Sequence, residues 1–248
     1  MTGAGLANAY LGVPDLGLTT VTEVADHVAA IREAVAVPVI VDADTGFGNA
    51  LNMRRTVRLL ERAGANAIQI EDQVFPKRCG HFEGKEVVPA GEMVGKIKAA
   101  VDARHGDLMI IARTDSRAVE GMDAALSRAR AYAQAGADAL FVEAPQSLEE
   151  LRRIPRDLRG VHIANMVFGG KTPLLPREEL ASMGFAGILY ANAALQAAMR
   201  AMKDAMAHLA AHGSLAGAED RLISFAERQA LVDFDRFRAL ESRYRDGS

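Results

Sequence analysis

The sequence has few of the features that mark membrane, secreted or nucleic-acid-binding proteins. Its only cysteine is Cys79, so no disulfide can form within the chain, and we expect a protein of the reducing cytoplasm. It has neither the run of roughly 20 apolar residues that crosses a bilayer nor a basic segment followed by an apolar core at its start. The 29 Lys and Arg residues nearly balance the 32 Asp and Glu residues, so we expect neither nucleic acid nor a membrane as a partner.

Short apolar segments recur between amphipathic stretches, and they predict the strands of a sheet. Each is almost continuously apolar and lacks the alternation of a half-exposed strand, which is typical of strands covered on both faces. The predicted strands are Val37–Val41, Ala67–Ile70, Leu108–Ala112, Ala139–Val142, Val161–Ala164 and Gly187–Tyr190.

An internal repeat indicates how these strands are connected. Residues 63–71 resemble residues 135–143, 72 positions further on, as expected for repeated βα units of a parallel sheet with helices outside. No nucleotide-binding glycine motif follows a first strand, which favours a closed barrel over an open doubly wound sheet. We therefore predict a TIM-type (β/α)8 barrel. With only six strands visible, its first strand and part of its second are lacking, and Met1–Gly5 is expected to be a strand end and the following loop.

Several residues mark the expected ends of helices. Thr20 with Glu23, and Ser147 with Glu150, have the spacing of capping boxes at helix starts. Gly64 and Gly136 precede strands and are expected to end helices in a left-handed conformation.

The C-terminal part of the chain has a helical pattern. We predict one barrel domain over residues 1–248, in which residues 195–248 form a helical extension. Residues 213–217 are expected to interrupt this extension, with helices over 219–232 and within the charged tail 234–248.

Carboxylates follow the first two predicted strands. Asp42 and Asp44 end one strand, two positions apart and expected on the same side, and Glu71 ends the next. The active sites of parallel barrels lie at this edge, and a divalent cation relieves the repulsion between converging carboxylates. Oxygen ligands without a His or Cys cluster favour Mg²⁺, or Mn²⁺, over Zn²⁺. The alternative is that these acids cap helices or face solvent.

The loop after the Glu71 strand contains the only thiol. Cys79 lies beside Lys77, Arg78 and His81, whose positive charges favour a thiolate, and such a group can move a proton to or from a carbon acid. The alternative is a small buried side chain of no chemical role.

Two further features point to an anionic substrate. Arg113 ends the third predicted strand and is expected to bind a substrate carboxylate through its two-pronged guanidinium, the alternative being a structural ion pair. The Thr45–Gly48 loop has glycines that allow backbone N–H groups to approach an anion.

Taken together, these motifs resemble a known enzyme superfamily. Asp42–Gly48, Glu71–Gln73, Lys77–His81, Arg113–Asp115 and Gly170–Pro173 are similar to segments of the isocitrate lyase and phosphoenolpyruvate mutase superfamily, over residues 1 to about 210. The Lys-Arg-Cys-Gly-His string is specific for its carbon–carbon lyase branch. The resemblance implies a homotetramer that exchanges C-terminal helices.

The resemblance also implies the site and its chemistry. Asp42, Asp44 and Glu71 would hold Mg²⁺ with Asp15 nearby, and Cys79 would protonate the enolate left after cleavage. Further site residues carried over are the catalytic Arg113 and His81 and the substrate-binding Thr2, Gly3, Ala4, Gly46, Gly80, Arg113, Glu143 and Asn165.

The substrate implied by this branch is a small carboxylate. We expect cleavage of a 2-hydroxy di- or tricarboxylate, of the 2,3-dimethylmalate or 2-methylisocitrate type, to pyruvate or a related 2-oxo-acid. The alternatives are decarboxylation or hydrolysis of oxaloacetate, a phosphonate mutase, or a non-catalytic truncated relative. Phe168 stands where the family often has an acid, so the pocket is expected to differ there.

Overall fold

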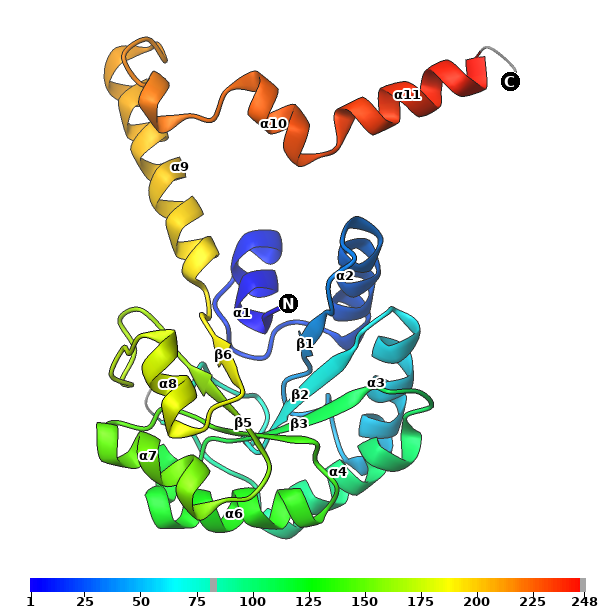
Figure 1. Ribbon diagram of the computed structural model, residues 1–248, viewed down its shortest axis with the longest axis vertical. Helices are drawn as coiled ribbons and strands as arrows, with labels where there is room; N and C mark the ends of the chain where they lie inside the picture. Colours follow the sequence, from blue (N-terminus) through cyan, green and yellow to red (C-terminus); the bar gives the residue numbers. More distant parts are fainter. Residues whose placement is uncertain (81–83, 246–248) are drawn as a thin grey trace. The chain divides into compact units, whose positions relative to one another are not determined.

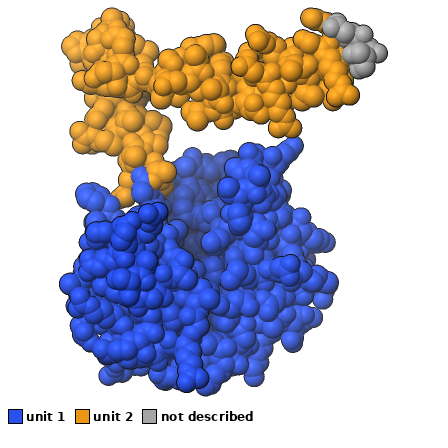
Figure 2. Space-filling view, viewed as in Figure 1, with its two compact units in different colours: residues 1–193 blue, residues 194–248 orange. Residues whose placement is uncertain are grey.

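The computed structural model describes residues 1–80 and 84–245. The chain divides into two compact units, Met1–Ala193 and Ala194–Ser248 (Figure 2). This boundary lies next to residue 195, where the sequence predicts the helical extension to begin. Within the described residues, no helix is both long and apolar enough to cross a membrane.

The first unit is built on a curled parallel sheet (Figure 1). Among the described residues its strands are β1 (Ile40–Asp42), β2 (Ala67–Glu71), β3 (Met109–Thr114), β4 (Ala139–Val142), β5 (Val161–Asn165) and β6 (Gly187–Leu189). They pair in chain order, and every pair is parallel. The sheet confirms the predicted incomplete barrel. Only β1 differs appreciably from its predicted bounds: it starts after Pro38, which has no N–H to donate to a ladder.

Helices connect the strands along the outside of the sheet. The described ones in this unit are α1 (Gly3–Leu6), η1 (Ala7–Leu11), α2 (Val21–Ala34), α3 (Ala50–Arg62), α4 (Ala90–Ala103), α5 (Arg117–Glu120), α6 (Met122–Gln134), α7 (Leu148–Asp157) and α8 (Arg177–Met183). A large cluster of buried apolar side chains joins the helices to the sheet. A smaller cluster, with Ile111 and Phe141, covers the inner face of the sheet.

The predicted helix boundaries are mostly confirmed. Thr20 and Glu23 form a complete capping box at the start of α2. Ser147 accepts a hydrogen bond from the Glu150 amide, but the Glu150 carboxylate binds Arg117 instead of completing the box. Gly64 and Gly136 follow α3 and α6 with φ of 100° and 105°, where a side chain would be strained.

The beginning of the chain differs from the prediction. Met1 does pair with β1 as a strand end would, because its carbonyl accepts from Asp42 N at 3.1 Å. The segment Gly3–Leu6 is helical, however, so the loop expected over Met1–Gly5 was wrong. Turning into a helix buries Leu6 and Ala7, which an open loop would leave in water.

The second unit is helical, as predicted. It contains most of α9 (Ala193–His212), a 3-10 turn η2 (Glu219–Arg221), α10 (Phe225–Leu231) and α11 (Phe234–Arg245). The predicted break at 213–217 is confirmed, and the tail is helical as far as Arg245. The helix predicted from Glu219 was wrong in its start, because Ser224 forms a capping box with Glu227 and begins α10 there.

Candidate active site

A cavity of about 640 Å³ in the first unit is lined by residues at the carboxyl ends of the strands and by side chains of the barrel interior. Many of the predicted site residues line it together: Thr2, Ala4, Asp42, Cys79, Gly80, Arg113, Glu143 and Asn165. They come from segments far apart in the sequence, as expected where parallel strands end at one edge.

Asp42 and Asp44 converge by a route other than the predicted one. β1 ends at Asp42, and Asp44 has a left-handed φ of 46°, so the two side chains do not share one side of a strand. They meet beside Gly3, whose amide donates to Asp42 Oδ2 at 3.0 Å. A Cβ atom on Gly3 would lie 3.1 Å from both Asp42 Oδ2 and Asp44 Oδ1, so a side chain here would crowd the two carboxylates.

The positive charge among these carboxylates is Lys77. Its buried ammonium lies 2.5 Å from Asp15 and 3.0 Å from Asp44. Burial lowers the pKa of Lys77, but the charges of Asp42, Glu71, Asp44 and Asp15 outweigh it and raise the pKa above its usual value. Burial and repulsion from Asp42 raise the pKa of Asp44 to about 7, against the attraction of Lys77.

Glu71 has one carboxylate oxygen available for a ligand, as far as the described part of the chain shows. It is buried, its Oε2 lies 3.2 Å from Arg113 Nη1, and its Oε1 accepts no hydrogen bond from the described residues. Burial raises its pKa, against the attraction of Arg113. This oxygen and the all-carboxylate donor set suit a hard divalent cation. Over residues 1–80 and 84–245, however, no three His, Cys, Asp or Glu side chains are already arranged around a metal position. The Lys77 ammonium lies beside Asp44, one of the proposed ligands.

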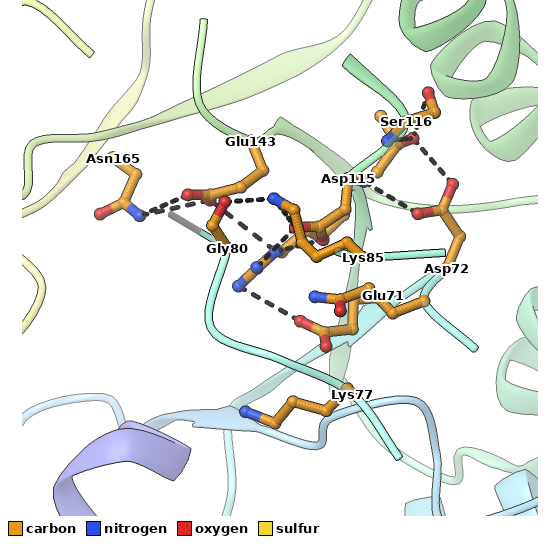
Figure 3. A network of polar contacts seen from close by, with 12 residues as sticks. Glu71, Asp72, Lys77, Gly80, Lys85, Asp115, Ser116, Glu143 and Asn165 are labelled. Atoms are coloured by element: carbon orange, nitrogen blue, oxygen red, sulfur yellow. Dashed lines mark hydrogen bonds and ion pairs between the residues drawn. The ribbon is translucent and has the colours of Figure 1, made fainter. Parts of the chain in front are cut away.

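Arg113 connects three carboxylates of the site, those of Glu71, Asp115 and Glu143, which Figure 3 shows. It donates two hydrogen bonds to Asp115, at 2.9 and 3.0 Å, and forms ion pairs with Glu71 at 3.2 Å and Glu143 at 3.7 Å. Asn165 donates to the Glu143 carboxylate at 3.3 Å. Arg113 therefore forms structural ion pairs and also lines the cavity. A guanidinium has five N–H groups and Asp115 accepts from two of them, so others remain for a substrate carboxylate.

The loop that carries Cys79 is held against this centre. The side chain of Gln73 accepts from the Arg78 amide at 2.9 Å and donates to the Arg78 carbonyl at 2.8 Å. Cys79 is partly exposed and lines the cavity. The Lys77 charge expected beside the thiol instead binds Asp15 and Asp44. His81 lies outside the described residues.

Three other residues that the sequence singles out, Gly46, Thr45 and Phe168, are not among those that line the cavity. Gly46 donates its amide to Ala43 O at 2.9 Å and does not line the cavity. The Thr45 hydroxyl is buried and has no hydrogen-bond partner among the described residues. Phe168 is 75% exposed.

Sequence reasoning did not anticipate the buried roles of Lys77 and Lys85. Their side chains are 3% and 2% exposed, whereas most lysines lie in water. Their only signal was their place in a loop that follows a strand ending in acids. The fold and this site define a barrel-type enzyme whose chemistry lies at the strand ends.

Comparisons with known proteins identify the family. The phosphoenolpyruvate phosphomutase family model matches residues 1–210. The chain is 49% identical to 2,3-dimethylmalate lyase of Eubacterium barkeri, over 100% of this chain and 86% of that relative. It is 44% identical to 2-methylisocitrate lyase of Aeropyrum pernix, over 94% of this chain and 75% of that one.

Solved structures of related enzymes resemble this chain in fold. Oxaloacetate acetylhydrolase in complex with 3,3-difluorooxalacetate has a TM-score of 0.93 at 31% identity, covering 100% of this chain and 84% of that one. Phosphonopyruvate hydrolase in complex with oxalate and Mg²⁺ has a TM-score of 0.85 at 32% identity, covering 98% and 85%. The chain belongs to the phosphoenolpyruvate phosphomutase and isocitrate lyase superfamily. Within that superfamily it is a carbon–carbon lyase.

Proposed function

We propose that this lyase cleaves a small 2-hydroxy di- or tricarboxylate, of the 2,3-dimethylmalate or 2-methylisocitrate type, and releases pyruvate or a related 2-oxo-acid. The observation that carries the proposal is the common cavity of Cys79, Arg113 and Asp42. A proton donor, a carboxylate-binding cation and a carboxylate cluster then face one bound molecule. These are groups that a retro-aldol cleavage requires.

Asp42, Asp44 and Glu71 are the residues proposed to hold Mg²⁺, with Mn²⁺ as the alternative ion. Glu71 Oε1, which has no hydrogen-bond partner over residues 1–80 and 84–245, and the oxygen-only donors support this choice. When bound, the ion supplies positive charge that stabilises an enolate. The presence of Mg²⁺ in the related phosphonopyruvate hydrolase complex supports the same assignment.

The chain's own residues bind the substrate and move the proton. Arg113 binds one substrate carboxylate through N–H groups that Asp115 does not use, and Asn165 and Glu143 flank it. As the carbon–carbon bond breaks, its electron pair forms the enolate, and the proton of the substrate hydroxyl passes to a carboxylate of the cluster, which returns it to solvent. Cys79 then transfers its S–H proton to the enolate carbon and becomes a thiolate, which regains a proton from solvent once product has left. His81 of the same loop is proposed to assist Cys79. Thr2, Gly3, Ala4, Gly46 and Gly80 are the proposed backbone contacts to the substrate.

The test is pyruvate release from 2,3-dimethylmalate, 2-methylisocitrate and oxaloacetate, each with Mg²⁺ and with a chelator. Metal-dependent cleavage of one hydroxy acid, lost in Cys79→Ser, is the expected result. A Cys79→Ser variant with full activity would remove the thiol from the reaction.

The second candidate is cleavage of oxaloacetate. It is favoured by the similarity to oxaloacetate acetylhydrolase. Turnover of oxaloacetate alone would select it, with oxalate plus acetate indicating hydrolysis and pyruvate plus carbon dioxide indicating decarboxylation. If all three acids are inert, the phosphonate mutase and the non-catalytic relative become the leading candidates.

We also propose that the chain assembles into a homotetramer with exchanged C-terminal helices. Large apolar side chains of the second unit are exposed, among them Met202 at 57%, Met206 at 59% and Phe237 at 62%. Exposed apolar surface of this kind is typical of association sites. Light scattering that gives the mass of one chain would contradict the proposal.

A further inference from the structure

Lys85 joins the segment that carries Cys79 and Gly80, called here the Cys79 loop, to Asp115 at the end of β3, called here the floor of the site. Its ammonium donates to the Gly80 carbonyl, next to Cys79, and lies 3.2 Å from Asp115 Oδ1 (Figure 3). The side chains of Lys85 and Asp115 are 2% and 0% exposed. Burying two charges is costly unless they are paired, so this contact is held in one geometry.

Asp115 serves two cations at once. Its Oδ1 faces both Lys85 and Arg113 Nη2, at 3.2 and 3.0 Å, and its Oδ2 accepts from Arg113 Nε at 2.9 Å. One carboxylate therefore connects the cation that fastens the loop with the cation proposed to bind substrate. A change in how Arg113 uses its donors alters the negative charge that Asp115 presents to Lys85.

The floor of the site is rigid. The Asp115 amide donates to Asp72 Oδ1 at 2.8 Å. Thr114 Oγ1 and the Tyr132 hydroxyl each donate to Asp72 Oδ2 at 2.7 Å. All four residues are fully buried, so Asp115 presents its carboxylate to Lys85 from a fixed position.

The loop also rests directly on the substrate-binding centre. A Cβ atom on Gly80 would lie 2.5 Å from Arg113 Nη2 and 2.7 Å from Glu143 Oε1. Only a glycine lets the backbone approach so closely. Gly80, and Cys79 beside it, therefore lie against the two side chains that flank the proposed carboxylate site.

We propose that Lys85 is a positioning residue that couples carboxylate binding at Arg113 to the position of the Cys79 loop. A carboxylate bound to the remaining N–H groups of Arg113 shares the positive charge of the guanidinium with Asp115. The negative charge of Asp115 is then less neutralised by Arg113, the Asp115–Lys85 pair is strengthened, and Lys85 holds Gly80 more firmly. This inference rests on the proposed function, because it takes Arg113 as the carboxylate site and Cys79 as the proton donor. It explains how the thiol is presented only to a site that contains an acid.

The test uses the fact that Cys79 is the only cysteine. The rate of its alkylation by iodoacetamide reports how firmly the loop is held, without any turnover. The rate is measured with and without oxalate and Mg²⁺ in the unaltered protein, in Lys85→Met and in the control Lys98→Met, which removes an exposed lysine of α4.

Oxalate should slow alkylation in the unaltered protein and in Lys98→Met. In Lys85→Met, alkylation should be at least about tenfold faster, the factor expected for one lost charge-assisted hydrogen bond, and oxalate should protect much less. Circular dichroism checks that each variant is folded. If Lys85→Met does not fold, Lys85→Gln provides the same test, because its amide is polar and can still donate a hydrogen bond but carries no charge for Asp115.

Equal alkylation rates, or equal protection by oxalate, in Lys85→Met and the unaltered protein would overturn the inference. Its failure is distinguishable from failure of the proposed function. Loss of protection in a protein that releases no pyruvate supports the coupling alone, whereas normal pyruvate release with unchanged alkylation supports the lyase alone.

Discussion

The ammonium of Lys77 lies 3.0 Å from Asp44 Oδ1, in the carboxylate cluster that the sequence assigns to a metal ion. Both side chains are at least 95% buried, with exposed fractions of 3% and 5%. Lys77 also lies 2.5 Å from Asp15, so the ammonium of a single side chain stabilises several carboxylates. The protein thereby keeps a group of carboxylates close together, because their mutual repulsion is offset by this ammonium.

Removing that cation should destabilise the metal-free protein. Lys77→Met leaves Asp15 and Asp44 buried without their cation, and breaking a buried pair typically costs about 3–5 kcal/mol. The free energy of unfolding, measured with urea in the presence of a chelator, should fall by this order. Lys98→Met is the matched control and should change it little. An unchanged stability of Lys77→Met would show that the carboxylates tolerate each other unaided.

Removing one carboxylate should weaken metal binding. Asp42→Ala deletes a proposed ligand, and we expect the affinity for Mg²⁺ to fall by at least the roughly tenfold to hundredfold seen for outer-shell partners of metals. Isothermal titration measures it directly. Asp26→Ala, which removes an exposed acid of α2, should bind as the unaltered protein does. Unaltered affinity in folded Asp42→Ala would place the ion elsewhere.

The buried hydroxyl of Tyr132 should contribute to the stability of the site. Tyr132→Phe removes its hydrogen bond to Asp72 Oδ2 and leaves a buried acceptor with one partner fewer. We expect the free energy of unfolding to fall by about 1–3 kcal/mol. Tyr244→Phe, at a side chain in α11 that is 73% exposed, is the control. Equal stability of the two variants would contradict the importance of this contact.

His162 should make stability depend on pH. Burial lowers its pKa, against a hydrogen bond to Leu158 O, so the folded protein favours the neutral ring. The unfolded chain binds the proton more readily, so stability is fully present above the ordinary histidine pKa and is lost as pH falls below about 6.5 towards the lower folded value. Urea unfolding at pH 8 and pH 5 measures the loss. It should shrink in His162→Gln and persist in His212→Gln, which changes an exposed ring; equal losses in both would rule out this cause.

The sequence by itself determined the secondary structure of the barrel unit. Apolar segments such as Ala139–Val142 form strands where both faces of a parallel sheet are covered, here by helices outside and apolar side chains inside, so these bounds follow from composition. Thr20 and Glu23 satisfy each other locally, and the capping box could be predicted for that reason. The same local logic failed for the segment Gly3–Leu6, whose helix depends on the burial of Leu6 by distant elements.

The candidate site was only partly visible in the sequence. Because parallel strands end at one edge, Asp42, Glu71 and Arg113 were expected to meet, and Asp42 and Arg113 do line one cavity. What only the tertiary structure decided is how their charges are balanced. In the sequence, Lys77 and Lys85 look like surface lysines, yet their side chains are 3% and 2% exposed. Burial and pairing of a charge arise from contacts between distant segments, which only the folded chain brings together.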